Sequence, residues 1–153
     1  MANYYGNGRS NYFKVKDMAA FLEWLDTRAP GMEVASRHMV DKKRERELLA
    51  EDPTQEICLL AETEDGDYPS WIYNEEDGDD EEVDFIGELS KHLLEETGNV
   101  FIWQHVGNEK LRYVSGYAIA ITHDGKTFQV SIRDIYDKVC EELDITEVSH
   151  CEY

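Results

Sequence analysis

The stretch that decides the fold is residues 99–131, NVFIWQHVGNEKLRYVSGYAIAITHDGKTFQVS. β-Branched and aromatic residues recur with a period of about two in three runs within it, 100–106, 111–121 and 128–130. A period of two is typical of strands that place one face on a core. The sequence therefore predicts three consecutive strands.

The links between these runs predict a meander. Asp124-Gly125 joins the second run to the third, and this pair tolerates the positive φ that tight hairpin turns require. Residues 106–110 predict a looser turn between the first run and the second. Around 117–121 both faces are apolar or small, with Ala118 and Ala120 on one of them. We therefore expect this strand to be central and covered on both sides.

The remaining chain alternates extended and helical patterns. Residues 1–8, rich in Gly, Asn and Tyr, predict a loose arm, and residues 10–15 a short strand. Asp17 can cap a helix over 18–28, which Pro30-Gly31 ends. The further expectations are a strand over 32–36, a short solvated helix or insertion over 38–50, a hairpin of 57–61 with 68–73, and a helix from Phe85 to Gly98 with Phe85, Ile86, Leu89, Leu93 and Leu94 inward.

The C-terminal part predicts one more helix. Ser131 and Asp134 have the spacing of a capping box. Ile132, Ile135, Val139 and Leu143 follow at helical spacing and are expected to face the core. The tail, 145–153, is unassigned. The order of elements indicates an α+β fold over a single domain, 1–153, with a mostly antiparallel sheet, a C-terminal three-stranded meander and about three packed helices.

Composition restricts the class of protein. The chain has 153 residues, 41% of them hydrophobic, enough for a core in one domain. It contains no run of 18 apolar residues and its N-terminus lacks the apolar region of a secretory signal, so we expect neither a membrane span nor secretion. Three cysteines without CxxC spacing, Cys58, Cys140 and Cys151, favour a reduced, cytoplasmic protein.

The charge is concentrated in one segment. The net charge is −19, yet residues 47–90 alone contain seventeen acidic residues and no Lys or Arg. Such a balance argues against direct binding of nucleic acid through its phosphates. Dense like charges repel, so the folded surface should keep them in water. Their simplest role is solubility, or contact with another basic protein by a small non-catalytic accessory or adaptor domain.

A sharper hypothesis is that the acidic segment imitates nucleic acid. Residues i and i+2 of a strand lie roughly 6.8 Å apart on one side, and residues i and i+4 of a helix about 6 Å apart. Both distances are close to the separation of neighbouring phosphates. A row of carboxylates could then occupy a basic groove of a nucleic-acid-binding protein. The candidate partner-binding residues are Glu62, Glu64, Asp65, Asp67, Glu75, Glu76, Asp77, Asp79, Asp80, Glu81, Glu82, Asp84 and Glu88.

The chain resembles small acidic proteins of phages and plasmids that inhibit restriction or CRISPR nucleases. The resemblance lies in size, charge and α+β make-up. Residues 9–17, RSNYFKVKD, and 109–118, EKLRYVSGYA, also look like segments of uncharacterised proteins carried on mobile elements. The resemblance implies an inhibitor that binds a basic, nucleic-acid-binding defence complex in the place of nucleic acid. From the sequence itself we expect no enzyme activity and no cofactor.

Metal and enzyme motifs are incomplete. Asp77, Asp79, Glu81 and Glu88 have the spacing of positions 1, 3, 5 and 12 of a calcium loop, but Glu82 stands where the glycine of position 6 is required. The histidines lack HxxxH or HxxH spacing. GxSxG, P-loop and GxGxxG motifs are absent, and Gly6-Asn7-Gly8 lacks a third glycine. Cys58 lies in an apolar run typical of a core strand. We expect no catalytic residues and no metal site.

Overall fold

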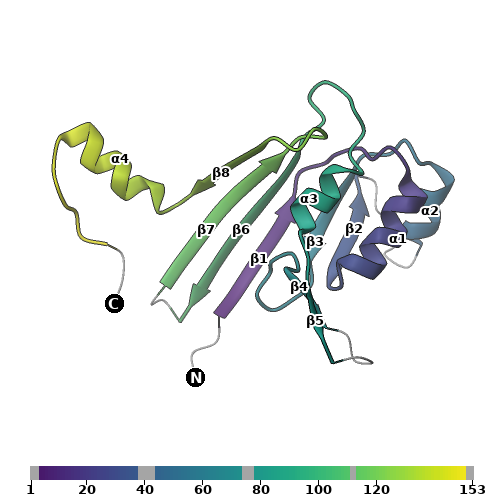
Figure 1. The fold of residues 1–153 in the computed structure, drawn as a ribbon, viewed down its shortest axis with the longest axis horizontal. Helices are drawn as coiled ribbons and strands as arrows, with labels where there is room; N and C mark the ends of the chain where they lie inside the picture. Colours follow the sequence, from purple (N-terminus) through teal and green to yellow (C-terminus); the bar gives the residue numbers. More distant parts are fainter. Residues whose placement is uncertain (1–3, 38–43, 74–77, 111–112, 151–153) are drawn as a thin grey trace.

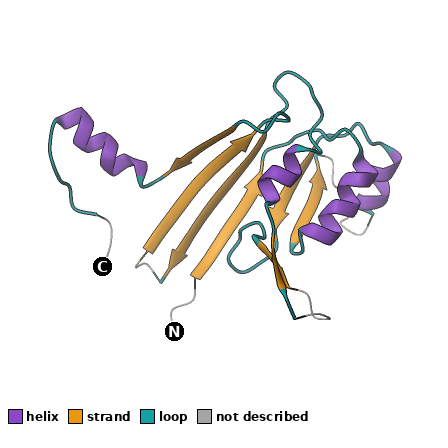
Figure 2. Ribbon diagram, in the orientation of Figure 1, coloured by secondary structure: helices purple, strands orange, loops and turns teal. Residues whose placement is uncertain are grey.

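The computed structural model describes residues 4–37, 44–73, 78–110 and 113–150. Its centre is a six-stranded antiparallel sheet in the order β2-β3-β1-β6-β7-β8, beside a separate two-stranded ribbon, β4-β5 (Figure 1). Four helices accompany the strands of the described chain, three in front of the sheet and one beyond its edge (Figure 2). The α+β class is therefore confirmed.

The predicted meander is present and longer than expected. It comprises β6 (Phe101–Glu109), β7 (Tyr113–Ile121) and β8 (Thr127–Ser131). Residues 106–109, predicted as a turn, instead continue β6, because Glu109 pairs directly with Tyr113. Leu111 of the second predicted run lies outside the described residues. The second turn is as predicted, with Gly125 at φ +83°.

The N-terminal prediction was wrong. Most of the expected loose arm is β1 (Tyr4–Ser10), which lies between β3 and β6 and pairs with β6 along its whole length. Residues 1–3 of that arm lie outside the described residues. The strand expected over 10–15 is reduced to two isolated bridges, Phe13 to Ile57 and Val15 to Leu93. The chain thus enters the sheet earlier than its glycine content indicated.

Three helices cover one face of the sheet. In α1 (Met18–Arg28), Asp17 accepts a hydrogen bond from Ala20 N, as its capping role requires. α2 (Glu45–Glu51) buries Leu49 and Glu45, so the helix predicted as solvated contributes to the core; residues 38–43 are outside the described part. α3 (Phe85–Ser90) ends well before Gly98, although Leu93 is still buried. The fully buried side chains include Phe13, Phe21, Leu49, Leu59, Phe85, Phe101 and Trp103.

The pairing of β3 differs from the prediction. β2 (Met32–Ser36) and β3 (Ile57–Ala61) are where the sequence placed them. The segment 68–73, however, does not pair with β3. Its end forms β4 (Trp71–Tyr73), which pairs with β5 (Asp80–Glu82) in the separate ribbon. β3 instead pairs with β1 and β2, because β1 occupies the position expected for the hairpin partner.

The C-terminal helix is not packed on the core. α4 (Asp134–Leu143) begins with the predicted contact, Ser131 N donating to Asp134 Oδ2 at 2.7 Å. None of its residues is buried, and Ile132, Ile135 and Leu143, predicted to face inward, are exposed. α4 projects beyond the β8 edge, away from the other helices (Figure 1). The expectation that β7 is covered on both faces was also wrong, since α1, α2 and α3 lie on one side of the sheet only.

Candidate functional site

The structure separates the predicted acidic residues into two groups. Asp67 and Glu88 are half-buried, whereas the others that it describes are exposed. Glu75, Glu76 and Asp77 lie outside the described residues. Several of the predicted carboxylates make contacts within the chain, among them those of Asp65, Asp67, Glu81, Asp84 and Glu88.

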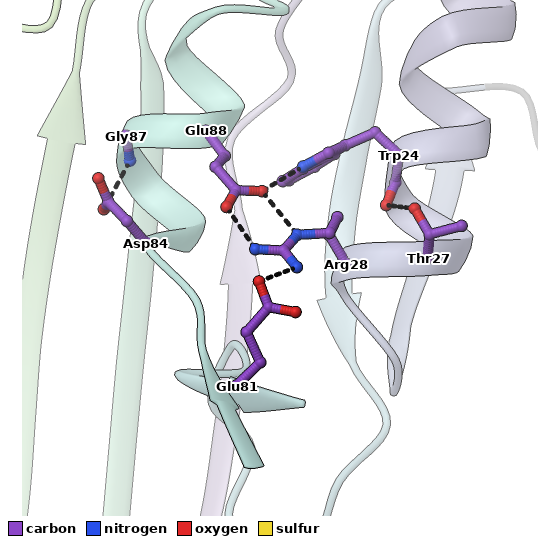
Figure 3. A network of polar contacts seen from close by, with 7 residues as sticks. All are labelled: Trp24, Thr27, Arg28, Glu81, Asp84, Gly87 and Glu88. Atoms are coloured by element: carbon purple, nitrogen blue, oxygen red, sulfur yellow. Dashed lines mark hydrogen bonds and ion pairs between the residues drawn. The ribbon is translucent and has the colours of Figure 1, made fainter. Parts of the chain in front are cut away.

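Glu88 belongs to an ion-pair cluster that ties three elements together (Figure 3). Arg28, the last residue of α1, donates from Nε and Nη2 to the two Glu88 oxygens at 3.1 and 2.8 Å, and Trp24 Nε1 donates to Glu88 at 2.8 Å. Nη1 of the same guanidinium reaches Glu81 of β5 at 2.7 Å. The hydrogen bond from Arg28 holds the pKa of Glu88 below its usual value. Glu88 and Glu81 therefore join α3 and β5 to α1.

Asp84 has a local structural role. Its Oδ1 accepts a hydrogen bond from Gly87 N at 3.0 Å and caps the N-terminus of α3. The contact is also drawn in Figure 3. The carboxylate is exposed, but its orientation is set by the helix that it caps.

Asp67 anchors the segment between β3 and β4 to the sheet. Its carboxylate accepts hydrogen bonds from Trp103 Nε1 at 3.2 Å and from the Tyr117 hydroxyl at 2.6 and 2.8 Å. Burial, followed by the hydrogen bond to Asp67, raises the pKa of Tyr117 far above its usual value, so the hydroxyl stays a donor. Asp67 is therefore a structural residue of this loop.

The same loop rests directly on β1 and places three acidic residues in solvent. Gly6 N donates to Glu64 O at 3.0 Å, and the His105 ring nitrogen Nε2 lies 2.9 Å from Asp65 O. These contacts use the backbone of the loop and leave its acidic residues exposed, although Asp65 Oδ1 also accepts a hydrogen bond from Asp67 N at 3.4 Å. The carboxylates concerned are those of Glu62, Glu64 and Asp65.

The outer face of the β4-β5 ribbon combines acidic and aromatic side chains. Trp71 pairs with Glu82 and Tyr73 with Asp80, and directly opposed residues project from the same face of a sheet. Trp71 and Tyr73 are 57% and 71% exposed. On the opposite face, Ile72 packs against the core and Glu81 reaches Arg28. The ribbon therefore presents Trp71, Tyr73, Asp80 and Glu82 together to solvent.

Sequence reasoning missed the two aromatic residues. Their signal was available: Trp71 and Tyr73 alternate with Ile72 beside the acidic run. The sequence pattern instead predicts a hairpin of 68–73 with 57–61, and that pairing would place Trp71 and Tyr73 on the main sheet. The large exposed aromatics become informative only once the ribbon register is known, because Trp and Tyr are the residues enriched at binding hot spots.

The calcium-like spacing does not form a site in the described part of the chain. Glu81 lies in a strand and, like Glu88, is bound to Arg28. Among the described residues, no group of three or more His, Cys, Asp or Glu side chains could hold a metal ion. Cys58 is buried, as predicted, and burial raises the pKa of its thiol.

Calcium is accordingly expected to leave the protein unchanged. Adding either calcium in excess or a chelator should not move the melting temperature, because ligand binding to the native state alone would raise it. Differential scanning fluorimetry at matched ionic strength, with magnesium as the control cation, measures this. A rise produced by micromolar calcium and not by magnesium would contradict the prediction.

Comparisons with known proteins do not assign the site. Among the described residues, no helix is long and apolar enough to cross a membrane. No protein-family model matches the chain, and neither the curated proteins nor the solved structures give a match.

Proposed function

We propose that the protein is an acidic, non-enzymatic inhibitor that binds a nucleic-acid-binding protein in the place of nucleic acid. The observation that carries the proposal is the charge of residues 47–90, which contain seventeen acidic residues and no basic one. Its target would be a basic complex of the restriction or CRISPR kind, in keeping with the resemblance to counter-defence proteins. The acidic surface would meet the basic groove of that complex.

The binding surface proposed here is smaller than the sequence alone suggested. Asp67, Glu81, Asp84 and Glu88 are left out because their carboxylates already have partners in the fold. Glu62, which also interacts within the chain, is left out as well. The remaining described candidates are exposed and lie on the loop before β4 or at the ribbon: Glu64, Asp65, Asp79, Asp80 and Glu82.

The ribbon supports the nucleic-acid-mimic hypothesis in two ways. Asp80 and Glu82 alternate along β5, so their carboxylates repeat at roughly 6.8 Å, close to the phosphate repeat. Trp71 and Tyr73 stand beside them on the same face. Aromatic rings next to a row of negative charge imitate bases next to phosphates, and they also supply the apolar anchors that give an interface most of its affinity.

The alternative function is an adaptor that contacts some other basic protein, or an acidic surface that only maintains solubility. Both readings accommodate the charge of the segment. Neither requires exposed aromatics beside the acids, and neither requires competition with nucleic acid. Competition is therefore the property that separates the hypotheses.

Reversing the ribbon charges should abolish binding. In Asp79→Lys/Asp80→Lys/Glu82→Lys, the negative row becomes positive, and we expect affinity for the target to fall by more than about a hundredfold, since several charge contacts turn repulsive. Binding of purified restriction and CRISPR effector complexes to the immobilised protein, measured by biolayer interferometry with and without saturating duplex DNA, tests this. The parent should lose binding in DNA, and its association rate should fall steeply with salt.

Two controls make the test specific. Glu95→Lys/Asp137→Lys/Glu141→Lys makes the same change in net charge at exposed residues elsewhere and should bind like the parent. Trp71→Ala/Tyr73→Ala keeps every charge and should accelerate dissociation. Undiminished binding in the presence of DNA, or equal losses in the two triple-lysine variants, would contradict the proposal.

A further inference from the structure

The face of the sheet opposite the three helices is uncharged and mostly apolar over β6, β7 and β8, with Gln104 and Asn108 as its polar residues on β6. The register places Ile102 of β6 beside Ala120 of β7, Gln104 beside Ala118 and Val106 beside Gly116 on this face. Val114, Phe128 and Val130 share it, and all three are exposed. In a chain with 32% charged residues, the outward positions of these three strands carry no Asp, Glu, Lys or Arg. Contiguous exposed apolar surface of this kind marks an interaction site.

α4 carries a second exposed apolar face. Ile135, Val139 and Leu143 recur at four-residue spacing, so they lie on one side of the helix. Ile135 is 53% and Leu143 65% exposed. The acidic residues Asp134, Asp137 and Glu141 lie on the other side, whereas Glu142, three residues after Val139, lies at the border of the apolar side. The segment after the helix turns back and stacks His150 on Tyr136, but it leaves the side with Ile135 and Leu143 open.

The junction between β8 and α4 prevents the helix from covering its own sheet. Ile132 N donates to Gly116 O at 2.9 Å and continues the pairing of β8 with β7. Ser131 N donates to Asp134 Oδ2, and Arg133 N donates to Ser131 Oγ at 3.2 Å. These bonds fix the direction of α4 past the sheet edge, where Figure 1 shows it. Folding α4 back onto the sheet would break them.

The edge strand itself is unprotected. β8 reads Thr-Phe-Gln-Val-Ser and is the last strand of the sheet. Native proteins usually protect an edge with a charge, a proline or a bulge, because its free N–H and C=O groups pair readily with another strand. β8 has neither charge nor proline. An additional strand beside it would extend the sheet into the space where α4 projects.

We propose that a second copy of this chain occupies this surface. In an isologous dimer across β8, the α4 helix of each copy lies on the uncharged face of the other copy's β6-β7-β8. Ile135, Val139 and Leu143 would enter the shallow groove of about 360 Å³ bordered by Val106, Gly116, Val130 and Ile132. Each copy supplies both an apolar helix face and an apolar sheet face, so the same contact can form twice across a two-fold axis.

Area and charge both suit this occupant. Seven large apolar side chains of the two faces are 48–65% exposed: Val106, Val114, Phe128, Val130, Ile132, Ile135 and Leu143. Together they offer on the order of 400–800 Å² of apolar area per copy. A standard interface buries about 800 Å² per partner, a little over half of it apolar. The exposed acids of the ribbon lie on the helix-bearing side, so two copies can meet without bringing those charges together.

Sedimentation velocity across micromolar concentrations tests the proposal. The parent chain should sediment as a dimer. Ile135→Gln/Leu143→Gln on the helix and Phe128→Gln/Val130→Gln on the sheet should each raise the dimer dissociation constant at least about a hundredfold and give monomers. Asp137→Asn/Glu141→Gln changes the polar side of the same helix and should leave the dimer intact. Far-UV circular dichroism verifies that each variant is folded.

Hydrogen exchange of the parent protein provides a second readout. The amides of β8 and α4 should gain protection as concentration rises, because dimerisation pairs the edge and covers the helix. A parent that is monomeric at every concentration, or variants that stay dimeric, would overturn the proposal. A monomer with α4 protected at all dilutions would also overturn it and would identify the chain's own sheet face as the occupant.

Discussion

Replacing Gly66 by alanine is expected to lower the free energy of unfolding by more than about 4 kcal/mol. Losses of this size are exceptional and arise from severe steric or burial defects. Gly66 has φ +66°, where an L side chain is strained. Its added Cβ would also lie 2.2 Å from the Gly6 carbonyl carbon and 2.4 Å from Asn7 N. Those atoms belong to the backbone of β1 and cannot move without disrupting its pairing with β6.

The consequence should spread beyond Gly66. If the loop leaves β1, Asp67 can no longer accept the hydrogen bonds of Trp103 and Tyr117, and both donors lose their partner in the core. Gly6→Ala tests the same contact from the other side, since its Cβ would lie 1.8 Å from Asp65 O. Urea unfolding followed by tryptophan fluorescence measures both variants.

Gly125→Ala is the matched control. Gly125 has φ +83°, but no atom lies within 4 Å of the position of its Cβ. The substitution should therefore cost only the conformational strain, about 1–2 kcal/mol. Similar losses at Gly66 and Gly125 would show that the close approach between the loop and β1 contributes nothing, contrary to the prediction.

This contact also explains why the sequence misled at the N-terminus. Glycine and asparagine are depleted in strands, so Gly6-Asn7-Gly8 indicated a loose arm. A Cβ at Gly6 would clash with the carbonyl oxygen of Asp65, and one at Gly8 with that of Gly66, because the loop after β3 packs directly on β1. Close approach of another backbone is a known reason for glycine in a strand. This close approach depends on the tertiary structure, so no local pattern in residues 1–8 predicts it.

Local patterns were sufficient where an element is defined by its own residues. The meander followed from period-two runs and the Asp124-Gly125 turn, and α1 followed from Asp17 and its apolar spacing. For α4 the same reasoning found the apolar face correctly and misplaced it. Periodicity shows that Ile135 and Leu143 share a side of the helix, but not which surface covers that side.

The candidate site was predictable as a region rather than as a set of residues. Charge counting located the acidic segment. It could not distinguish Asp80, which is exposed, from Glu88, whose partner Arg28 lies 60 positions away in the chain. Only the packing of α1 against α3 assigns Glu88 to the fold. The sequence also does not predict which residues of β4 and β5 pair, so it gives no reason to place Trp71 beside Glu82.

Replacing Arg28 by methionine should destabilise the protein by about 2 kcal/mol. The change keeps much of the side-chain volume and removes the guanidinium, so that Glu88 loses its charge partner and keeps only the Trp24 hydrogen bond. Leaving a buried charge unpaired costs about 3–5 kcal/mol. The Arg28 and Glu88 side chains are 25% and 24% exposed, so solvent screening reduces that cost here.

The loss should depend on pH in a defined direction. Arg28 lowers the pKa of Glu88 in the folded state below its value in the unfolded chain. The stability that this shift contributes is fully present above the unfolded pKa, about 4.3, and is lost as pH falls through the folded pKa. Urea unfolding of parent and Arg28→Met between neutral and acidic pH should therefore show a difference that closes below about pH 4. A difference independent of pH would assign the loss to packing alone.

Arg46→Met is the control for the same substitution at an exposed ion pair. Arg46 contacts Asp26, both side chains are largely in solvent, and the expected loss is below about 0.5 kcal/mol.

The two variants should also differ in binding. Arg28 ties the ribbon to α1 through Glu81, so its loss should free the ribbon that carries Trp71 and Asp80 and weaken target binding. Arg46 has no contact with the ribbon among its described ion pairs, and Arg46→Met should bind like the parent because the proposed surface keeps its support.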